Sequence, residues 1–357
     1  MSGLILAVRH YAVMFLLLVI CLVVYVTLLY VTTPNERLTQ RLGPSTFAAV
    51  DLPDQLSSTS ESNDNMSIIV HVIWFFPPRT ELRFHHALAL MAVQRYARPR
   101  KILFWYDAAS TPPVGRWWLL ARYSGVHVLP VPYRRPKSVF NQTVSVIEHQ
   151  SDVARIAIIE RYGGLYIDLD VILVRPLNSL FRFDVVLGAE TGDLLGSGFI
   201  LARRPGAEFI RRWRRSYADK FDDTNWNHHA CRVPMMLADL YPNLVHVEWY
   251  SIHQPNWFDR QWLYTDGLLW DWSRNFAVHL WIRTHPKNVI YDPVSIRRLN
   301  TTTGEIFRHI YYGDTRLLDS FNLTFQDLQP SLASSKLLHE PGADSQSIRD
   351  HTVDRST

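Results

Sequence analysis

The stretch Arg161-Tyr162-Gly163-Gly164-Leu165-Tyr166-Ile167-Asp168-Leu169-Asp170-Val171-Ile172-Leu173 decides the fold. A helical run ends at its two glycines, because glycine tolerates the left-handed turn that stops a helix. A short apolar strand follows, and Asp168 and Asp170 lie at its end. Side chains alternate along a strand, so both carboxylates are expected to face one way while Leu169 faces the other.

This pair of carboxylates favours a metal site. Two carboxylates on one side of a rigid element bind a hard divalent cation that a phosphate can share. The alternative is a polar turn with two solvated aspartates, which is the usual form of an isolated Asp-x-Asp. Here the aspartates interrupt an apolar segment, where unpaired charge is costly, and this favours the metal site.

Upstream, a helix is expected over 144–162, with Asp152 and Arg155 on one face. Alone, this pair is typical of a surface salt bridge. Together, Ser-Asp-x-x-Arg and Gly-Gly-x-Tyr-x-Asp-x-Asp resemble glycosyltransferase family 32, the D-x-D-containing enzymes with a sugar-binding region. The resemblance is strongest over 144–177 and weaker over 68–285.

The resemblance implies a GT-A-like nucleotide-sugar-binding fold and a retaining transfer reaction. It implies that Asp168 and Asp170 are catalytic and bind Mn²⁺ or Mg²⁺, Asp170 directly and Asp168 through water or beside the ribose. Asp152 and Arg155 are then expected to hold hydroxyl groups of the donor sugar, and Tyr166 to line the same pocket.

Strand and helix patterns alternate over the rest of the domain, which predicts an α/β fold with a mostly parallel central sheet. Strands are expected at 67–76, 101–107 and 126–131, and helices at 79–97, 115–123, 144–162 and 205–220. In such sheets, ligands bind at the carboxyl ends of the strands. Asp168 and Asp170 are expected there.

Two further segments resemble the family more weakly. His71-Val72-Ile73-Trp74 resembles its H-x-I-W segment, which places Trp74 beside the nucleotide base. By chemistry alone, a core position is the better explanation of Trp74, and the resemblance makes the two explanations equal. Ala277-Val278-His279-Leu280-Trp281 resembles its A-x-H-x-W segment, which makes His279 a third metal ligand.

The region after the aspartates predicts two strands, 185–190 and 196–202, joined by a loop that carries Glu190 and Asp193. In related enzymes the acceptor and the anomeric carbon meet nearby. Glu190 and Asp193 are therefore candidates for the nucleophile or for acceptor contacts, and the alternative is that both are ordinary loop carboxylates.

The amino-terminal part predicts a membrane anchor. Residues 11–31 are 21 consecutive positions without a charge, enough to span a hydrocarbon layer of about 30 Å. We expect a cytoplasmic tail (1–10), a single transmembrane signal anchor (11–31), a polar stem (32–67), a catalytic domain (68–328) and a polar tail (329–357).

Four N-x-S/T sequons, at Asn65, Asn141, Asn300 and Asn322, follow the predicted anchor. Such sequons are acceptors for N-glycans in the secretory pathway. They favour a type II membrane protein with its catalytic domain in the Golgi lumen.

The composition fits an anchored globular protein, with 47% hydrophobic and 20% charged residues. A formal net charge of +4 is too small to indicate a nucleic-acid partner. The expected partners are a nucleotide-sugar donor, most readily a UDP-sugar, and a glycan or glycolipid acceptor. The alternatives are a non-catalytic lumenal sugar-binding or scaffolding protein of the same fold, or a hydrolase of nucleotide sugars.

Overall fold

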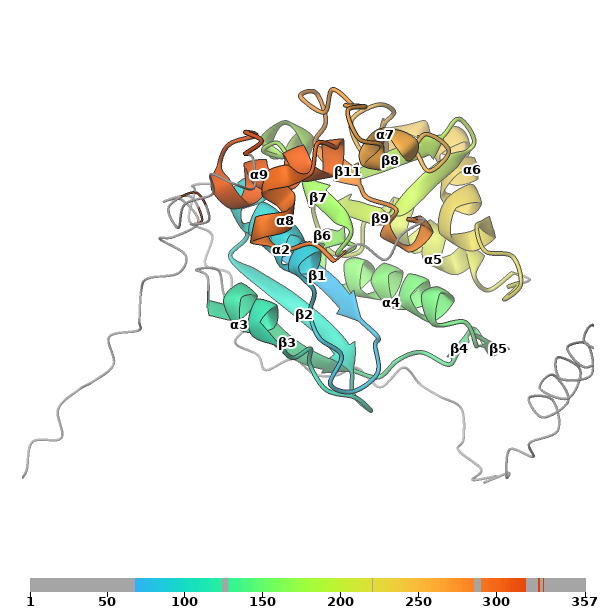
Figure 1. Cartoon of the computed structure of the whole chain (residues 1–357). Helices are drawn as coiled ribbons and strands as arrows, with labels where there is room; N and C mark the ends of the chain where they lie inside the picture. The colour runs from blue at the N-terminus through green and yellow to red at the C-terminus, as the bar shows by residue number, and fades with distance from the viewer. Residues whose placement is uncertain are drawn as a thin grey trace, which may run out of the picture. The chain divides into compact units, whose positions relative to one another are not determined.

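The computed structural model describes residues 68–123, 128–219, 221–285 and 290–318, together with Asp327 and Pro330 (Figure 1). All of them belong to one unit of the chain. The predicted anchor and stem, and residues 331–357, lie outside the described residues. Along the part that is described, no helix combines the length and the apolar composition needed to cross a membrane.

Within these ranges, the main sheet has seven strands in the order β10-β8-β9-β6-β1-β2-β3. Their bounds are β1 (Ile69–Trp74), β2 (Lys101–Asp107), β3 (Val128–Tyr133), β6 (Gly164–Ile167), β8 (Val185–Thr191), β9 (Leu194–Ala202) and β10 (His246–Glu248). All neighbours pair in parallel except β9, which is antiparallel to both β6 and β8. The predicted α/β fold with a mostly parallel sheet is confirmed.

The antiparallel strand has a local cause. Only Gly192 and Asp193 separate β8 from β9, and such a short connection reverses the chain into a hairpin. The prediction of a longer loop carrying Glu190 is therefore wrong, because Glu190 belongs to β8 and its side chain is buried.

Helices cover both faces of the sheet (Figure 1). One face packs against α2 (Phe84–Tyr96), α3 (Arg116–Tyr123), α8 (Pro293–Arg298) and α9 (Thr302–Tyr312), and the other against α4 (Ile147–Tyr162), α5 (Glu208–Ser216) and α6 (Val233–Leu240). Along β6, Leu165 and Ile167 join the first core while Tyr166 joins the second. The apolar runs of the strands follow from this burial on both faces.

Three expected helices begin three to five residues later than predicted. The helix expected from residue 144 begins at Ile147, because the backbone of Val146 is extended. The helix expected from residue 79 begins at Phe84, because Arg79 has a φ of 60° and Glu81 pairs with Val114 in a short β-bridge. The helix expected from residue 205 begins at Glu208, because Gly206 has a φ of 65° and ends the preceding turn.

A second sheet pairs β7 (Val171–Leu173) with β11 (Ala277–His279) in antiparallel register. His279 lies opposite Val171, so a residue far along the chain reaches the Asp168–Asp170 segment. The remaining elements are short. They are β4 (Ser138–Val139), β5 (Gln142–Thr143), α7 (Gln261–Tyr264), the 3₁₀ helices Asn178–Arg182, Pro242–Leu244 and Ile282–Thr284, and the π-helical turn His228–Arg232.

The structure corrects the expected geometry of the aspartate pair. β6 ends at Ile167, and Asp168, Leu169 and Asp170 form a turn before β7. The amide of Val171 donates to the carbonyl oxygen of Asp168 at 3.0 Å. The two aspartates are therefore not alternate residues of one strand, and the strand argument for their common direction does not apply.

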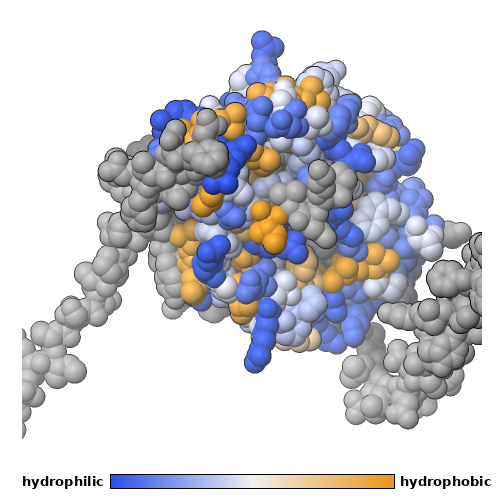
Figure 2. Space-filling view, in the orientation of Figure 1, coloured by the Kyte–Doolittle hydropathy of each residue, from blue (hydrophilic) through white to orange (hydrophobic). Residues whose placement is uncertain are grey.

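The surface of this unit is mixed. On the face that Figure 2 shows, hydrophobic residues drawn in colour form small groups separated by hydrophilic ones. Many large apolar side chains are buried in the two cores on either side of the sheet, while others, such as Tyr250 and Ile290, are exposed.

Candidate active site

Two glycines bring the aspartate turn to the carboxyl end of the sheet. Gly163 ends α4 with a φ of 62°, and its amide donates to the carbonyl oxygen of Ile159. Gly164 has a φ of 87°, and a Cβ atom there would lie 2.2 Å from the carbonyl oxygen of Ile69 in β1. Only glycine allows β6 to start so close to β1. The positive φ of Gly163 agrees with the helix stop that the sequence predicted.

Asp168 is held by two donors. Its Oδ2 accepts from Arg155 Nη1 at 3.2 Å, and its Oδ1 accepts from the Tyr166 hydroxyl group at 2.5 Å. Burial raises the pKa of Tyr166 well above its usual value, so this hydroxyl remains a donor. Asp168 is thus oriented from both sides by residues that the sequence placed in the same pocket.

Arg155 is the centre of this part of the site. Besides Asp168, it contacts Asp152 Oδ1 at 3.3 Å and the Ser197 carbonyl oxygen at 2.9 Å, and its guanidinium lies 4.7 Å from the Tyr166 ring centroid. Burial opposes the charge of Arg155, but Asp168, Tyr166 and Asp152 outweigh it and raise the pKa. Burial raises the pKa of Asp152 to about 6, even though Arg155 acts to lower it.

Asp170 pairs with His279 instead. His279 Nε2 lies 3.4 Å from Asp170 Oδ2, and the imidazole stacks on Trp281 with ring centroids 3.6 Å apart. Burial acts to raise the pKa of Asp170, but His279 outweighs it and the pKa is lowered. Burial acts to lower the pKa of His279, but Asp170 outweighs it and the pKa is raised. The sequence-predicted neighbours, Asp170 and His279, are thus side by side.

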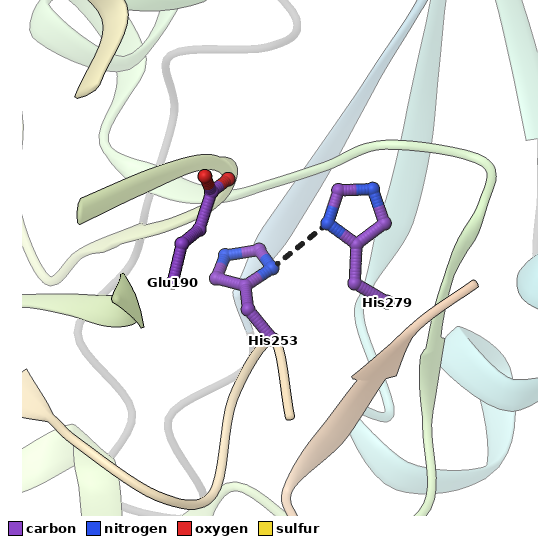
Figure 3. Close-up of side chains that lie close together, drawn as sticks. All are labelled: Glu190, His253 and His279. Atoms are coloured by element: carbon purple, nitrogen blue, oxygen red, sulfur yellow. Dashed lines mark hydrogen bonds between the residues drawn. The ribbon is translucent and has the colours of Figure 1, made fainter. Parts of the chain in front are cut away.

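Two more buried side chains, those of Glu190 and His253, lie close to His279 (Figure 3). Glu190, His253 and His279 are buried, and each offers a possible metal-ligand atom within 4.8 Å of the others. His253 Nδ1 lies 3.2 Å from His279 Nδ1. Burial raises the pKa of Glu190 and lowers that of His253 well below its usual value. Carboxylate oxygen and imidazole nitrogen are the ligands of transition-metal ions such as Mn²⁺.

Sequence reasoning missed His253. It lies in an irregular segment after β10, with a backbone φ of 60° and a side chain that is 0% exposed. No motif or spacing marked it, because a single histidine among aromatic residues looks like core. Only the chain path past β8 and β11 brings it to the site.

Three glycines of the β8–β9 hairpin make room for these side chains. A Cβ atom on Gly188 or Gly196 would lie 2.4 Å from Ile252 or from His253 Nε2, respectively, and one on Gly198 would lie 3.0 Å from Asp168 Oδ2. The Gly196-Ser197-Gly198 segment was the available sequence signal, since glycine inside a strand marks a close approach of other groups.

Two other predicted site residues have different surroundings. Trp74 is 1% exposed and belongs to the core beneath the sheet, with its ring 4.2 Å from that of Phe76. Asp193 is exposed at the hairpin tip and pairs with Arg232 at 3.3 Å. Of the two carboxylates predicted near the anomeric carbon, the structure brings only Glu190 to the cluster.

Two predicted sequons are described by the structure. Asn141 is exposed between β4 and β5, with a φ of 64°. Asn300 precedes α9, where its sequon residue Thr302 is buried and donates to the carbonyl oxygen of Trp262. Asn65 and Asn322 lie outside the described residues, and glycosylation at all four stays a prediction.

Part of the site lies in a region that matches a known family. Residues 115–187 match the family described as "Glycosyltransferase sugar-binding region containing DXD motif". This region contains Asp152, Arg155, Asp168 and Asp170, whereas Glu190, His253 and His279 follow it.

Two curated relatives are similar over part of their length. Glucan organizing enzyme 1 of Cryptococcus neoformans var. grubii is 29% identical over 176 residues, covering 47% of this chain and 46% of the relative. Human lactosylceramide 4-alpha-galactosyltransferase is 30% identical over 91 residues, covering 26% and 24%. The chain spans less than half the length of these relatives.

Solved glycosyltransferases are also similar. The galactosyltransferase LgtC, solved in complex with donor and acceptor sugar analogues, is 12% identical, with a TM-score of 0.36 and coverage of 68% of this chain and 95% of that chain. The PaToxG glycosyltransferase is 16% identical, with a TM-score of 0.35 and coverage of 49% and 68%.

Proposed function

We propose that this chain moves a sugar from a nucleotide-sugar donor to a hydroxyl group of a glycan or glycolipid. The match of residues 115–187 to a glycosyltransferase sugar-binding region with a DXD motif supports this proposal. The donor we favour is a UDP-sugar. The carrying observation is that one turn presents Asp168 to Arg155 and Asp170 to His279. The GT-A-like fold and a retaining outcome are part of this proposal.

The residues present fit a divalent cation, Mn²⁺ or Mg²⁺. Two atoms that bind one such ion at about 2.1 Å, about a right angle apart, lie about 3 Å from each other. The separation of 3.4 Å between Asp170 Oδ2 and His279 Nε2 is close to this value. Both groups would hold the ion, with Asp168 beside them, and the buried imidazole of His253 adds to the chemistry expected of a metal site. When bound, the cation acts as a Lewis acid that neutralises charge on the diphosphate leaving group.

The side chains of this chain orient the donor. Arg155 and Tyr166 occupy the two oxygens of Asp168, so Asp168 reaches the donor only with its remaining lone pairs, through water or at the ribose. Asp152 contacts Arg155, and its pKa is raised to about 6. It would offer an oxygen to the hydroxyl groups of the donor sugar.

In the overall transfer, a bond from the anomeric carbon to the acceptor oxygen replaces the bond from that carbon to the diphosphate, with retention of configuration. The electron pair leaves with the diphosphate, and the acceptor hydroxyl group loses its proton. Glu190 is the candidate acceptor for this proton. Burial raises its pKa, which makes its ionised carboxylate a better proton acceptor than an ordinary glutamate.

We further propose that the protein is a single-pass type II membrane protein of the Golgi, with the described domain in the lumen. The uncharged residues 11–31 and the sequons support this placement. The acceptor would then be a glycan or lipid carried through that compartment.

The test is a donor screen with the full-length chain in detergent. UDP-galactose, UDP-N-acetylglucosamine, UDP-glucose and GDP-mannose are each incubated with Mn²⁺ and a glycolipid mixture, and both nucleotide release and glycosylated product are measured. We expect one donor to give product with a retained anomeric configuration. Activity should be lost in excess EDTA and return with Mn²⁺.

The matched variants are Asp170→Asn and Asp193→Asn. The first removes a charge from the proposed cation site and is expected to lower kcat at least 100-fold, while the second alters an exposed pair and should leave kcat within about two-fold. Free sugar in place of product would indicate a hydrolase, and no nucleotide release with any donor would indicate a non-catalytic protein. Equal activity of the two variants would contradict the cation site.

A further inference from the structure

We propose that His253 is a positioning residue of the cation site: its Nδ1 accepts a hydrogen bond from His279 Nδ1 and thereby leaves the lone pair of His279 Nε2 for the metal ion. This inference rests on the proposed function, because it assumes that a cation binds between Asp170 and His279. It concerns a residue outside both the DXD turn and the matched family region.

The two ring nitrogens of His279 face different partners. Nε2 faces Asp170 Oδ2 at 3.4 Å, and Nδ1 faces His253 Nδ1 at 3.2 Å. A metal-bound imidazole is neutral and carries one proton, so binding through Nε2 puts that proton on Nδ1. His253 Nδ1 must then be the acceptor, and the proton of His253 must be on its Nε2.

The surroundings of His253 suit this tautomer. Its Nε2 lies beside the Gly196 backbone and makes no hydrogen bond of normal geometry within the described residues. Figure 3 shows the ring of His253 between Glu190 and His279. A proton on Nε2 is therefore on the side of the Glu190 carboxylate, which is the favourable electrostatic partner for an N–H group.

The chain holds His253 and His279 together. The carbonyl oxygen of Ser251 accepts from the amides of Phe276 and Ala277 at 2.7 and 3.1 Å. Asn275 Nδ2 donates to the carbonyl oxygen of Gln254 at 2.7 Å. The segment that carries His253 is thus attached directly to β11, which carries His279, so the contact between the imidazoles is built by the backbone.

Two features of the structure indicate that the position of His253 is energetically costly, and a functional role would account for this cost. His253 adopts a φ of 60°, which is uncommon for a residue other than glycine, and its side chain is fully buried. Gly188 and Gly196 lack side chains where a Cβ atom would lie within 3 Å of the imidazole. Residues that orient a metal-bound histidine through its second nitrogen commonly change metal affinity 10- to 100-fold when replaced.

The test compares two conservative variants of the full-length chain in detergent. His253→Asn keeps an acceptor atom near the position of Nδ1, whereas His253→Gln places its amide near the position of Nε2. The affinity for Mn²⁺ is measured from the electron paramagnetic resonance signal of the free ion, with UDP present. We expect His253→Asn to stay within about three-fold of the unmodified chain and His253→Gln to bind Mn²⁺ about 10- to 100-fold more weakly.

His71→Asn is the control. His71 is equally buried, and its two ring nitrogens contact the Gly163 carbonyl oxygen at 3.0 Å and Trp105 Nε1 at 3.2 Å. It should lose thermal stability without losing Mn²⁺ affinity.

Equal affinities of the two His253 variants, whether both strong or both weak, would overturn the positioning role. A loss of Mn²⁺ affinity in His71→Asn as large as that in His253→Gln would also overturn it, because the effect would then be general. Absence of Mn²⁺ binding by the unmodified chain would instead overturn the proposed cation, and this inference with it.

Discussion

At the scale of single residues, the site separates two aspartates that the sequence presents as a pair. Asp168 is held by Arg155 and Tyr166, and Asp170 by His279. Their different partners follow from the turn that ends β6, since a turn does not impose the common direction that a strand would. Under the proposed function, the two aspartates would have different roles, with Asp168 facing the donor and Asp170 facing the cation.

Buried histidines also set the response of the protein to acid. His71 Nδ1 accepts from Trp105 Nε1, so protonation of His71 would remove that acceptor and leave a buried charge. Burial lowers the pKa of His71 to about 4. In the unfolded chain, His71 has an ordinary pKa near 6.5 and binds a proton at a pH where the folded chain does not. The free energy of unfolding therefore falls as the pH drops below about 6.5.

We predict that His71→Asn reduces this acid sensitivity. When the pH is lowered from 7.5 to 5.0, His71 should reduce the free energy of unfolding by about 2 kcal/mol, and His71→Asn should lack this part of the decrease. The measurement is urea unfolding at both pH values for both proteins. Because Asp152 and Glu190 have raised pKa values and act in the opposite direction, the difference between the two proteins is the relevant quantity. Parallel curves would contradict the assignment.

At the scale of elements, the β8–β9 hairpin is the platform of the site. Its three glycines approach His253, Glu190 and Asp168, so the strand surface is recessed where the functional side chains lie. Glycine weakens a strand, and here the packing of other side chains against the bare backbone replaces what a side chain would contribute. The same hairpin makes β9 antiparallel.

We predict that Gly196→Ala lowers catalytic activity at least 10-fold. The added Cβ atom would lie 2.4 Å from His253 Nε2 and 2.9 Å from Glu190 Oε1, so both groups must move. The control is Gly192→Ala at the hairpin tip, where no atom lies within 4 Å of the added carbon among the described residues. Activity and melting temperature are measured for both variants, and a fully active Gly196→Ala would show that the recess is not needed.

At the scale of the whole molecule, three distant segments meet at the carboxyl end of β6. They are the aspartate turn, the hairpin and the segment from His253 to His279. Contacts across such sequence distances need the complete fold, because each loop must close before its residues can interact. The site therefore forms only when β11 has paired with β7.

The placement in the secretory pathway is testable on the full chain. Asn141 is exposed in the turn between β4 and β5, so it is the most accessible of the described sequons. We predict that endoglycosidase treatment of the protein from secretory membranes lowers its apparent mass, and that Asn141→Gln removes part of this shift. A protein of unchanged mass after treatment, although proven to enter the pathway, would contradict the lumenal placement.

The sequence by itself determined strands β1, β2, β3 and β6 and the helix stop at Gly163 and Gly164. These features are local, because hydrophobic pattern and glycine conformation act over a few residues. The grouping of Asp152, Arg155, Asp168 and Asp170 was implied by the family resemblance of their motifs. Only the tertiary structure decided that Asp168 and Asp170 sit in a turn with different partners, that Glu190 lies in a strand, and that His253 completes the cluster. Those outcomes depend on which distant segments pack side by side, and no short-range pattern encodes that choice.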